Sequence, residues 1–212
     1  MSEAIIAWYQ IDLDAPQDTT VLDTDEHARA ARLRDPVRAS RWATGRAALR
    51  TILARTVGGS PAVIDFCYGP HGKPALVAYP GIEFNIAHSG PLMVCAVSTL
   101  PVGIDCEWLD RSGARDLLRF LAPEEQQIVC ALPVAERSAA ILSIWVQKEA
   151  LLKARGTGLT VPLASFAVCC TPPGLLRWPD ATPWQICRWQ PAPGAVAAIA
   201  APAPFALVQH EL

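Results

Sequence analysis

Apolar residues along the chain follow helical and strand-like spacings, and these spacings occur in the same order twice. In the first part of the chain, the spacing predicts a strand at 3–12, helices at 25–33 and 38–57, and strands at 62–68, 83–89 and 92–98. In the second part, it predicts a strand at 102–108, helices at 114–120, 123–132 and 135–155, and strands at 165–170, 175–178, 184–190 and 195–201. The order therefore suggests a duplicated arrangement of helices and strands.

This duplicated order predicts an α+β fold, in which each half contains one long helix and several short strands. We place the boundary near residues 99–102, which gives an N-terminal half at 1–101 and a C-terminal half at 102–212. The residues themselves show no convincing repeat. Glycines at the ends of the long helices, Gly58 and Gly156, are typical of helix C-termini.

The composition is typical of a protein with a substantial core. Apolar residues make up 51% of the 212 residues, which is enough to fold without disulfides. The seven cysteines are odd in number, contain no C-x-x-C pair and lie mostly in apolar runs, as reduced thiols do. The first residues lack the basic region of a signal peptide, and no apolar run reaches membrane-spanning length. We therefore expect a cytoplasmic protein with no membrane contact.

Arginines are concentrated in one segment, although the formal net charge of the chain is only −2. Asp35 is the single acid among eight arginines, which stand at positions 29, 32, 34, 38, 41, 46, 50 and 55. A solvated helix face is one explanation, but so many like charges repel one another unless an anion lies nearby. Nucleic acid is disfavoured as the anion because base-stacking aromatic residues do not interleave these arginines. We expect a smaller anionic ligand.

Two acids share one face of the predicted strand VGIDCEW. The two-residue period of a strand places Asp105 and Glu107 on one side, and Ile104, Cys106 and Trp108 on the other. Adjacent carboxylates repel each other, so they need solvent, a basic side chain or a metal cation. A solvent-exposed strand face remains the simpler explanation for this pair alone.

The helix predicted at 135–155 carries Trp145, Glu149 and Lys153 at intervals of four residues, along one stripe. An ordinary ion pair between Glu149 and Lys153 would explain this spacing. However, the helix is largely apolar, and charged groups near its buried stripe are costly without partners. If the strand carrying Asp105 and Glu107 packs beside it, three carboxylates converge. Such an all-oxygen site suits Mg²⁺ rather than zinc.

The segment FNIAHSG ends a predicted strand and contains two candidate ligand contacts. His88 and Ser89 are neighbours that point in different directions in a strand, so they form no nucleophile–base pair. The chain also lacks the G-x-S-x-G motif of many hydrolases. The segment GPHGKP does not have the spacing of a phosphate-binding P-loop and is expected to be a turn. Its Lys73 is one of only three lysines in the chain.

Taken together and in this order, these segments resemble the two-domain, surfactin-synthetase-type 4′-phosphopantetheinyl transferases. The matching segments are RASRWATGRAALRTILA, GPHGKP, FNIAHSG, PVGIDCEW, and WVQKEALLKARGTGL followed by LASF. They extend from about residue 26 to 166, which is most of the chain. The combination of GIDxE with WxxKEAxxK about 40 residues later is more specific than either part alone.

The resemblance implies transfer of 4′-phosphopantetheine from coenzyme A to a serine of an acyl or peptidyl carrier protein, with release of 3′,5′-ADP. It also implies a pseudo-twofold fold with CoA in the cleft between two similar halves. Because both halves lie in one chain, the enzyme is expected to be a monomer. A module that binds CoA without catalysis is the alternative, and transfer to a carrier protein distinguishes the two.

The resemblance also assigns roles to individual residues. The Mg²⁺ ligands would be Asp105, Glu107 and Glu149. Catalysis would involve Asp105, Glu149 as the general base for the carrier serine, and Lys153 as a phosphate contact. The residues that would contact CoA are Arg29, Arg41, Lys73, Asn85, His88, Ser89 and Lys153.

Three positions depart from the family pattern. Ala87 replaces a serine found in many relatives, so one polar contact with the nucleotide is expected to be absent. Glu26 stands where some members have a basic residue, which leaves the ligands of the 3′-phosphate open. Cys106 replaces an aliphatic residue and is expected to face the core. The sequence does not identify the carrier protein or show whether acyl-CoAs are accepted.

Overall fold

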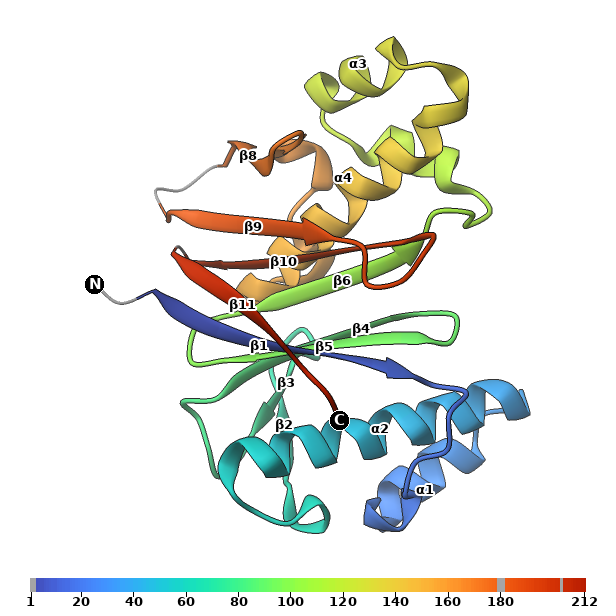
Figure 1. The fold of residues 1–212 in the computed structure, drawn as a ribbon, viewed down its shortest axis with the longest axis vertical. Coiled ribbons are helices and arrows are strands. Elements are labelled where there is room, and N and C mark those ends of the chain that lie inside the picture. Colours follow the sequence, from blue (N-terminus) through green and yellow to red (C-terminus); the bar gives the residue numbers. More distant parts are fainter. Residues whose placement is uncertain (1–2, 179–181, 203) are drawn as a thin grey trace.

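The computed structural model describes residues 3–178, 182–202 and 204–212, and arranges them in four layers (Figure 1). A long helix covers one sheet, a second sheet packs on the first, and another long helix covers the second sheet. The protein is therefore α+β, as the apolar pattern predicted.

The first sheet has four strands in the order β11-β1-β5-β4. The strands are β1 (Ala4–Asp12), β4 (Glu83–Ser89), β5 (Leu92–Ser98) and β11 (Phe205–His210). All neighbours are antiparallel except β1 and β11, which are parallel. Around this sheet lie α1 (Thr24–Ala31), α2 (Pro36–Val57) and the short hairpin of β2 (Phe66–Tyr68) and β3 (Pro74–Leu76).

The second sheet has three antiparallel strands in the order β6-β10-β9. The strands are β6 (Gly103–Trp108), β9 (Trp184–Trp189) and β10 (Ala195–Pro202). The other elements between β6 and β9 along the chain are the 3₁₀ helix η3 (Ala114–Phe120), α3 (Pro123–Ala131), α4 (Val134–Arg155), β7 (Ala167–Cys170) and β8 (Pro173–Arg177). Short 3₁₀ turns η1, η2, η4 and η5 cover Thr19–Val21, Pro61–Val63, Gly158–Thr160 and Leu163–Ser165.

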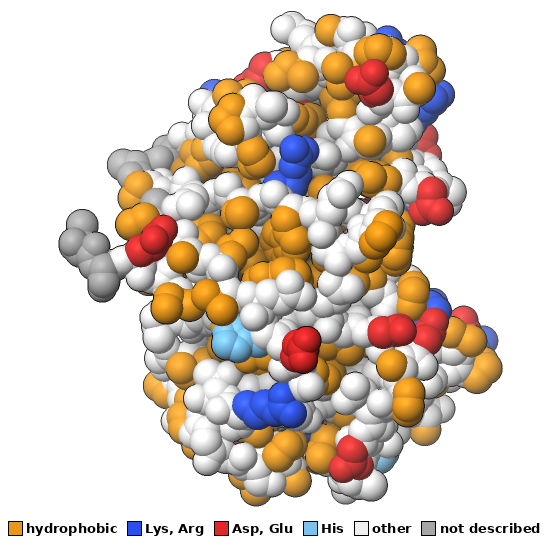
Figure 2. Space-filling view, in the orientation of Figure 1, with side chains coloured by type: hydrophobic (Ala, Val, Ile, Leu, Met, Phe, Trp, Pro, Cys, Tyr) orange, Lys and Arg blue, Asp and Glu red, His pale blue; other side chains and the backbone are white. Residues whose placement is uncertain are grey.

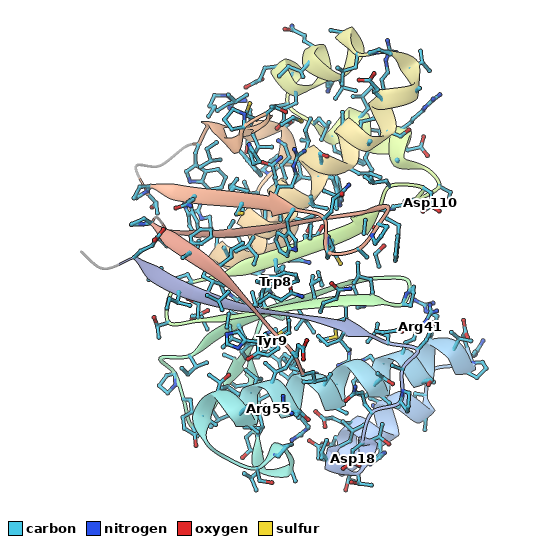
Figure 3. The ribbon with its side chains drawn as sticks, viewed as in Figure 1. Trp8, Tyr9, Asp18, Arg41, Arg55 and Asp110 are labelled. Carbon is cyan, nitrogen blue, oxygen red and sulfur yellow. The ribbon has the colours of Figure 1, made fainter. Side chains whose placement is uncertain are left out.

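Three apolar clusters hold the four layers together. One lies between α2 and the first sheet, one between the two sheets and one between the second sheet and α4. Trp8, labelled in Figure 3, belongs to the middle cluster, where its ring lies 4.8 Å from that of Trp189. All seven cysteines are free thiols, as predicted. None of the helices in the described ranges has the length and apolar character needed to cross a membrane.

Both long helices end at glycines, and α2 also begins at a capping aspartate. The Asp35 carboxylate accepts from the backbone N–H groups of the first turn of α2, where Pro36 needs no hydrogen-bond partner. Gly58 after α2 and Gly156 after α4 adopt φ values of 71° and 68°. These left-handed conformations favour glycine, so the predicted helix ends are confirmed.

Several predicted elements differ in extent or type. The strand predicted at 62–68 is limited to Phe66–Tyr68, because the preceding residues form a 3₁₀ turn. The helical segment 114–120 is 3₁₀ rather than α. The sequence analysis missed β3 and β11, and β11 returns from the C-terminal half to pair with β1. The division at residue 101 stays a prediction, but the two segments share a sheet through β11.

The closest contact between β6 and α4 occurs at Gly103. A Cβ atom built on this residue would lie 2.0 Å from the Ala150 carbonyl oxygen and 2.3 Å from the Ala154 nitrogen. Backbone atoms of a helix cannot move away locally as a flexible side chain would. Glycine is therefore required here for β6 and α4 to approach this closely.

We predict that Gly103→Ala lowers the free energy of unfolding by about 3 kcal/mol, because the added methyl group forces β6 and α4 apart. Urea unfolding followed by circular dichroism measures this change. Gly81→Ala is the matched control, since no atom lies within 4 Å of the Cβ position at Gly81. Equal stability of the two variants would contradict the proposed close packing.

Candidate active site

Charged side chains from β6 and α4 meet where these two elements pack. The Lys153 ammonium donates to Asp105 Oδ1 at 2.7 Å and to the Ile104 carbonyl at 3.1 Å. Glu149 lies one turn before Lys153, and its charge interacts with those of Asp105 and Glu107. The structure thus brings together the three acids and the lysine that the sequence singled out.

Burial dominates the electrostatics of this acidic cluster. It raises the pKa of Asp105 and of Glu149 above their ordinary values, because each carboxylate loses hydration. The Lys153 ammonium opposes the rise in both pKa values, whereas the neighbouring carboxylates, including Glu107, add to it. The three acids repel one another at buried or half-buried positions, so positive charge close to them is stabilising.

Two side chains of the protein supply positive charge to these acids. Lys153 contacts Asp105, and Arg111 forms an ion pair with Glu107. Across the described ranges, no group of three or more histidine, cysteine, aspartate and glutamate side chains is arranged to hold a metal ion. The predicted metal ligand set therefore stays a prediction. Its all-oxygen donors fit a hard dication, provided that the two cationic side chains turn away.

The end of β4 is tied to β6 beside the acids. Ser89 Oγ donates to Glu107 Oε2 at 2.8 Å, and the indole Nε1 of Trp108 donates to the Ser89 carbonyl at 2.8 Å. Cys106 faces the core between the sheets, as predicted, and burial raises the pKa of its thiol to about 12. Ser89 is therefore part of the acidic cluster.

A cavity of about 370 Å³ lies between the first sheet and α2, on the face of β4 that points away from the acidic cluster. It is lined by Leu13, Leu33, Arg38, Arg41, Trp42, Gly45, Arg46, Leu49, Ile86, His88, Gly90 and Met93. We call it the α2 pocket. Because successive residues of a strand point to opposite faces, His88 lines this pocket while Ser89 contacts Glu107. The opposite directions predicted for these two neighbours are confirmed.

Arg41 and Arg29 lie at or near the α2 pocket but already have partners. The Arg41 guanidinium makes two hydrogen bonds to Asp14, at 2.7 and 2.8 Å, and these lower the pKa of the Asp14 carboxyl. Arg29 lies over the ring of Trp42, with its Cζ atom 5.4 Å from the ring centroid. Figure 2 shows charged side chains of both signs gathered near the adjoining ends of α1 and α2.

Three pocket residues were given no individual role in the sequence analysis. Arg38, Trp42 and Arg46 repeat every four residues, so they follow one face of α2. Their spacing was the signal that could have identified them. No ion pair or hydrogen bond involves the Arg38 side chain within the described parts of the chain, which makes it available to an anion.

Glu26 is part of a buried ion-pair network next to this pocket. Its carboxylate accepts from Arg50 Nε at 2.6 Å, lies 3.3 Å from Arg46 Nε and closes the capping box of α1 with Asp23. Arg50 also pairs with Asp23 at 2.8 Å. The Glu26 carboxylate therefore orients Arg46 and Arg50 of α2 and joins α1 to α2.

Two residues predicted to contact CoA are engaged elsewhere. Asn85 Oδ1 accepts from the buried Ile104 N–H at 2.9 Å, so it connects the two sheets. Lys73 is not among the residues that line the α2 pocket, and its ammonium lies at the C-terminal end of α4.

A further lysine, Lys148, is fully buried and was mentioned in the sequence analysis only as part of a motif. It pairs with the buried Glu125 at 2.8 Å and donates to the carbonyl oxygens of Leu163 and Phe166. Burial lowers the pKa of Lys148, while Glu125 opposes this change. The pair joins α3 to α4 and thereby holds the helix that carries Glu149.

Comparison with known proteins identifies the family. Residues 101–200 match the family model of the 4′-phosphopantetheinyl transferase superfamily. The 4′-phosphopantetheinyl transferase HetI of Nostoc sp. (strain PCC 7120) is 34% identical over 211 residues, which cover 94% of this chain and 88% of HetI.

Two further relatives are from Bacillus subtilis. The 4′-phosphopantetheinyl transferase Sfp of strain 168 is 30% identical over 169 residues, or 78% of this chain and 75% of Sfp. Another 4′-phosphopantetheinyl transferase is 38% identical over 131 residues, or 61% of this chain and 58% of the relative. Because the similarity to HetI extends over nearly the whole length of both proteins, this chain belongs to the 4′-phosphopantetheinyl transferase superfamily and is a transferase of that class.

Proposed function

We propose that this transferase moves 4′-phosphopantetheine from coenzyme A to a serine hydroxyl of an acyl or peptidyl carrier protein and releases 3′,5′-ADP. The main support is the meeting of Asp105, Glu107, Glu149 and Lys153 on one face of β6, beside the end of β4. The other face of β4 lines the α2 pocket. One strand therefore separates an acidic cluster from an arginine-containing pocket.

The α2 pocket is proposed to hold the nucleotide end of CoA. Trp42 supplies a flat apolar surface, and Arg38, Arg41 and His88 supply positions for phosphate oxygens. Arg41 would exchange Asp14 for phosphate, while Arg38 needs no exchange. Arg29 is proposed to strengthen the positive field from its place over Trp42.

The acidic cluster is proposed to hold Mg²⁺ through Asp105, Glu107 and Glu149. The three carboxylates supply oxygen ligands, and a hard dication would relieve the repulsion that helps to raise the pKa of Asp105 and of Glu149. Bound there, Mg²⁺ supplies charge neutralisation to the pyrophosphate oxygens.

The protein's own residues are proposed to handle the proton and the remaining charge. The carrier serine oxygen attacks the β-phosphorus of CoA, and the bond to the oxygen that bridges the two phosphates breaks. Glu149 accepts the serine proton as the serine oxygen attacks. Lys153 turns from Asp105 towards a phosphate oxygen, and His88 contacts the phosphates from the other side of β4.

The two halves are proposed to be related by a pseudo-twofold axis, with CoA in the cleft between them. The 22-residue helices α2 and α4 support this relation, because each covers the outer face of one sheet and ends at a left-handed glycine. Both helices lie in one chain, so we propose a monomer. The seven free thiols are consistent with a cytoplasmic location.

We predict that Asp105→Ala, Glu107→Ala and Glu149→Ala each reduce carrier-protein labelling at least about a hundredfold, because each removes a ligand of the proposed Mg²⁺, whose positive charge is needed at the phosphates. Mass spectrometry of the carrier protein after incubation with CoA and Mg²⁺ measures the labelling. EDTA should abolish it, and added Mg²⁺ should restore it.

Asp110→Ala is the matched control for these acid variants. Asp110 is an exposed acid in the loop after β6, at the edge of the molecule in Figure 3. Its removal should leave labelling unchanged. Full labelling by Glu149→Ala would exclude both roles proposed for that residue. If the wild type binds CoA and labels no carrier protein, the chain is a noncatalytic CoA-binding module.

We predict that Arg38→Ala and Arg41→Ala each raise the KM for CoA about ten- to a hundredfold, with little change in kcat, because a charge-assisted phosphate contact contributes about 1.5–3 kcal/mol. Both variants should also lose the preference for CoA over dephospho-CoA, which lacks the 3′-phosphate. Arg29→Ala should act in the same direction.

Arg55→Ala is the matched control for the arginine variants. Arg55 lies on the same helix, 14 residues from Arg41 and therefore about 21 Å along its axis (Figure 3). Its KM for CoA should equal that of the wild type. If Arg38→Ala and Arg41→Ala retain the full preference for CoA, the 3′-phosphate does not bind in the α2 pocket.

A further inference from the structure

The turn GPHGKP belongs to the N-terminal half of the chain. It lies against the C-terminal end of α4, which belongs to the C-terminal half. Its Lys73 ammonium lies 3.2 Å from Glu83 Oε2, 3.2 Å from the Val102 carbonyl oxygen and 3.4 Å from the Ala154 carbonyl oxygen. The Lys73 side chain is 20% exposed. A lysine from the N-terminal half is therefore anchored partly in the C-terminal half.

The three acceptors lie in or next to the three elements that carry the candidate active site. Glu83 begins β4, which ends at His88 and Ser89. Val102 immediately precedes β6 and its two acids. Ala154 lies in the last turn of α4, next to Lys153. One ammonium group thus joins the ends of all three elements.

The chemistry of Lys73 favours this connecting role over a phosphate contact. An ammonium group has three N–H donors, and three acceptors surround it here, so none is left for CoA. The position at the C-terminal end of α4 is also electrostatically favourable, because the last carbonyl groups of a helix carry partial negative charge.

The lysine stem packs at a point where α4 ends. A Cβ atom added to Gly156, the left-handed residue after α4, would lie 3.6 Å from Lys73 Cδ. His71 of the same turn approaches Gly158 in a similar way, at 3.7 Å. Two residues of the turn, His71 and Lys73, therefore lie close to the segment that follows α4, and Lys73 approaches it with its stem as well as with its ammonium.

We propose that Lys73 is a positioning residue: it fixes β4, β6 and the C-terminal turn of α4 relative to one another, and thereby aligns Lys153 and Glu149 with Asp105. This inference rests on the proposed function for its effect on transfer. It replaces the CoA contact that the family resemblance implied for Lys73.

Lys73→Met tests the proposal, because it keeps the apolar stem and removes all three donors. We expect kcat to fall ten- to a hundredfold, since misplacement of catalytic groups by about 1 Å has effects of this size. The KM for CoA should stay within about twofold of the wild type, and the preference for CoA over dephospho-CoA should persist. Lys73→Arg should recover part of kcat.

Hydrogen exchange gives a readout that does not depend on activity. Backbone amides in the last turn of α4 should exchange at least about tenfold faster in Lys73→Met than in the wild type, because this turn loses its anchor. His71→Ala is the matched control, as it changes the same turn and retains the Cβ atom next to Gly158. Its exchange and kcat should match the wild type.

Three results would overturn the proposal. A raised KM with loss of the preference for CoA, at unchanged kcat and exchange, would make Lys73 a phosphate ligand. Wild-type values for all these measurements would show that the anchor is dispensable. If Lys73→Met fails to fold, Lys73→Arg takes its place, and wild-type exchange and kcat in that variant would show that the ammonium geometry is unimportant. Absence of transfer by the wild type would refute the proposed function alone, because the exchange comparison still tests the anchor.

Discussion

The close contact between β6 and α4 at Gly103 is the constraint on which the candidate active site depends. Asp105 and Glu107 are more than 40 residues from Glu149 and Lys153 in sequence, and the packing of β6 on α4 brings them together. A methyl group at Gly103 would collide with backbone atoms of α4. The glycine that precedes the acidic strand segment therefore determines how far the helix is from the carboxylates.

Several polar groups maintain this arrangement from outside the site. Lys148 and Glu125, both fully buried, connect α4 to α3. Asn85 connects the two sheets through the Ile104 N–H. Lys73 connects the ends of β4, β6 and α4. Lys73 and Lys148 each have three acceptors from the protein for their three donors, so they contribute order rather than a free binding group.

Strand β4 divides the chemistry between two environments. His88 faces the α2 pocket, which is mainly apolar with arginines along one helix, and Ser89 faces the buried acids. The strand period of two produces this division without any loop. A pyrophosphate that passes around the end of β4 would meet positive charge on one side and carboxylates on the other, which is the arrangement that the proposed transfer requires.

The sequence by itself determined the α+β class, the long helices and their ends, and the faces of β6, because these follow from periods of 3.6 and 2 and from glycine at helix termini. It also singled out, through family motifs, the four charged residues that meet in the candidate active site. Only the tertiary structure decided the position of β11, the partners of Lys73 and Asn85, and the place of Arg38 in the lining of the α2 pocket. These depend on contacts between distant segments, and a spacing pattern within one segment carries no information about which other segment packs against it.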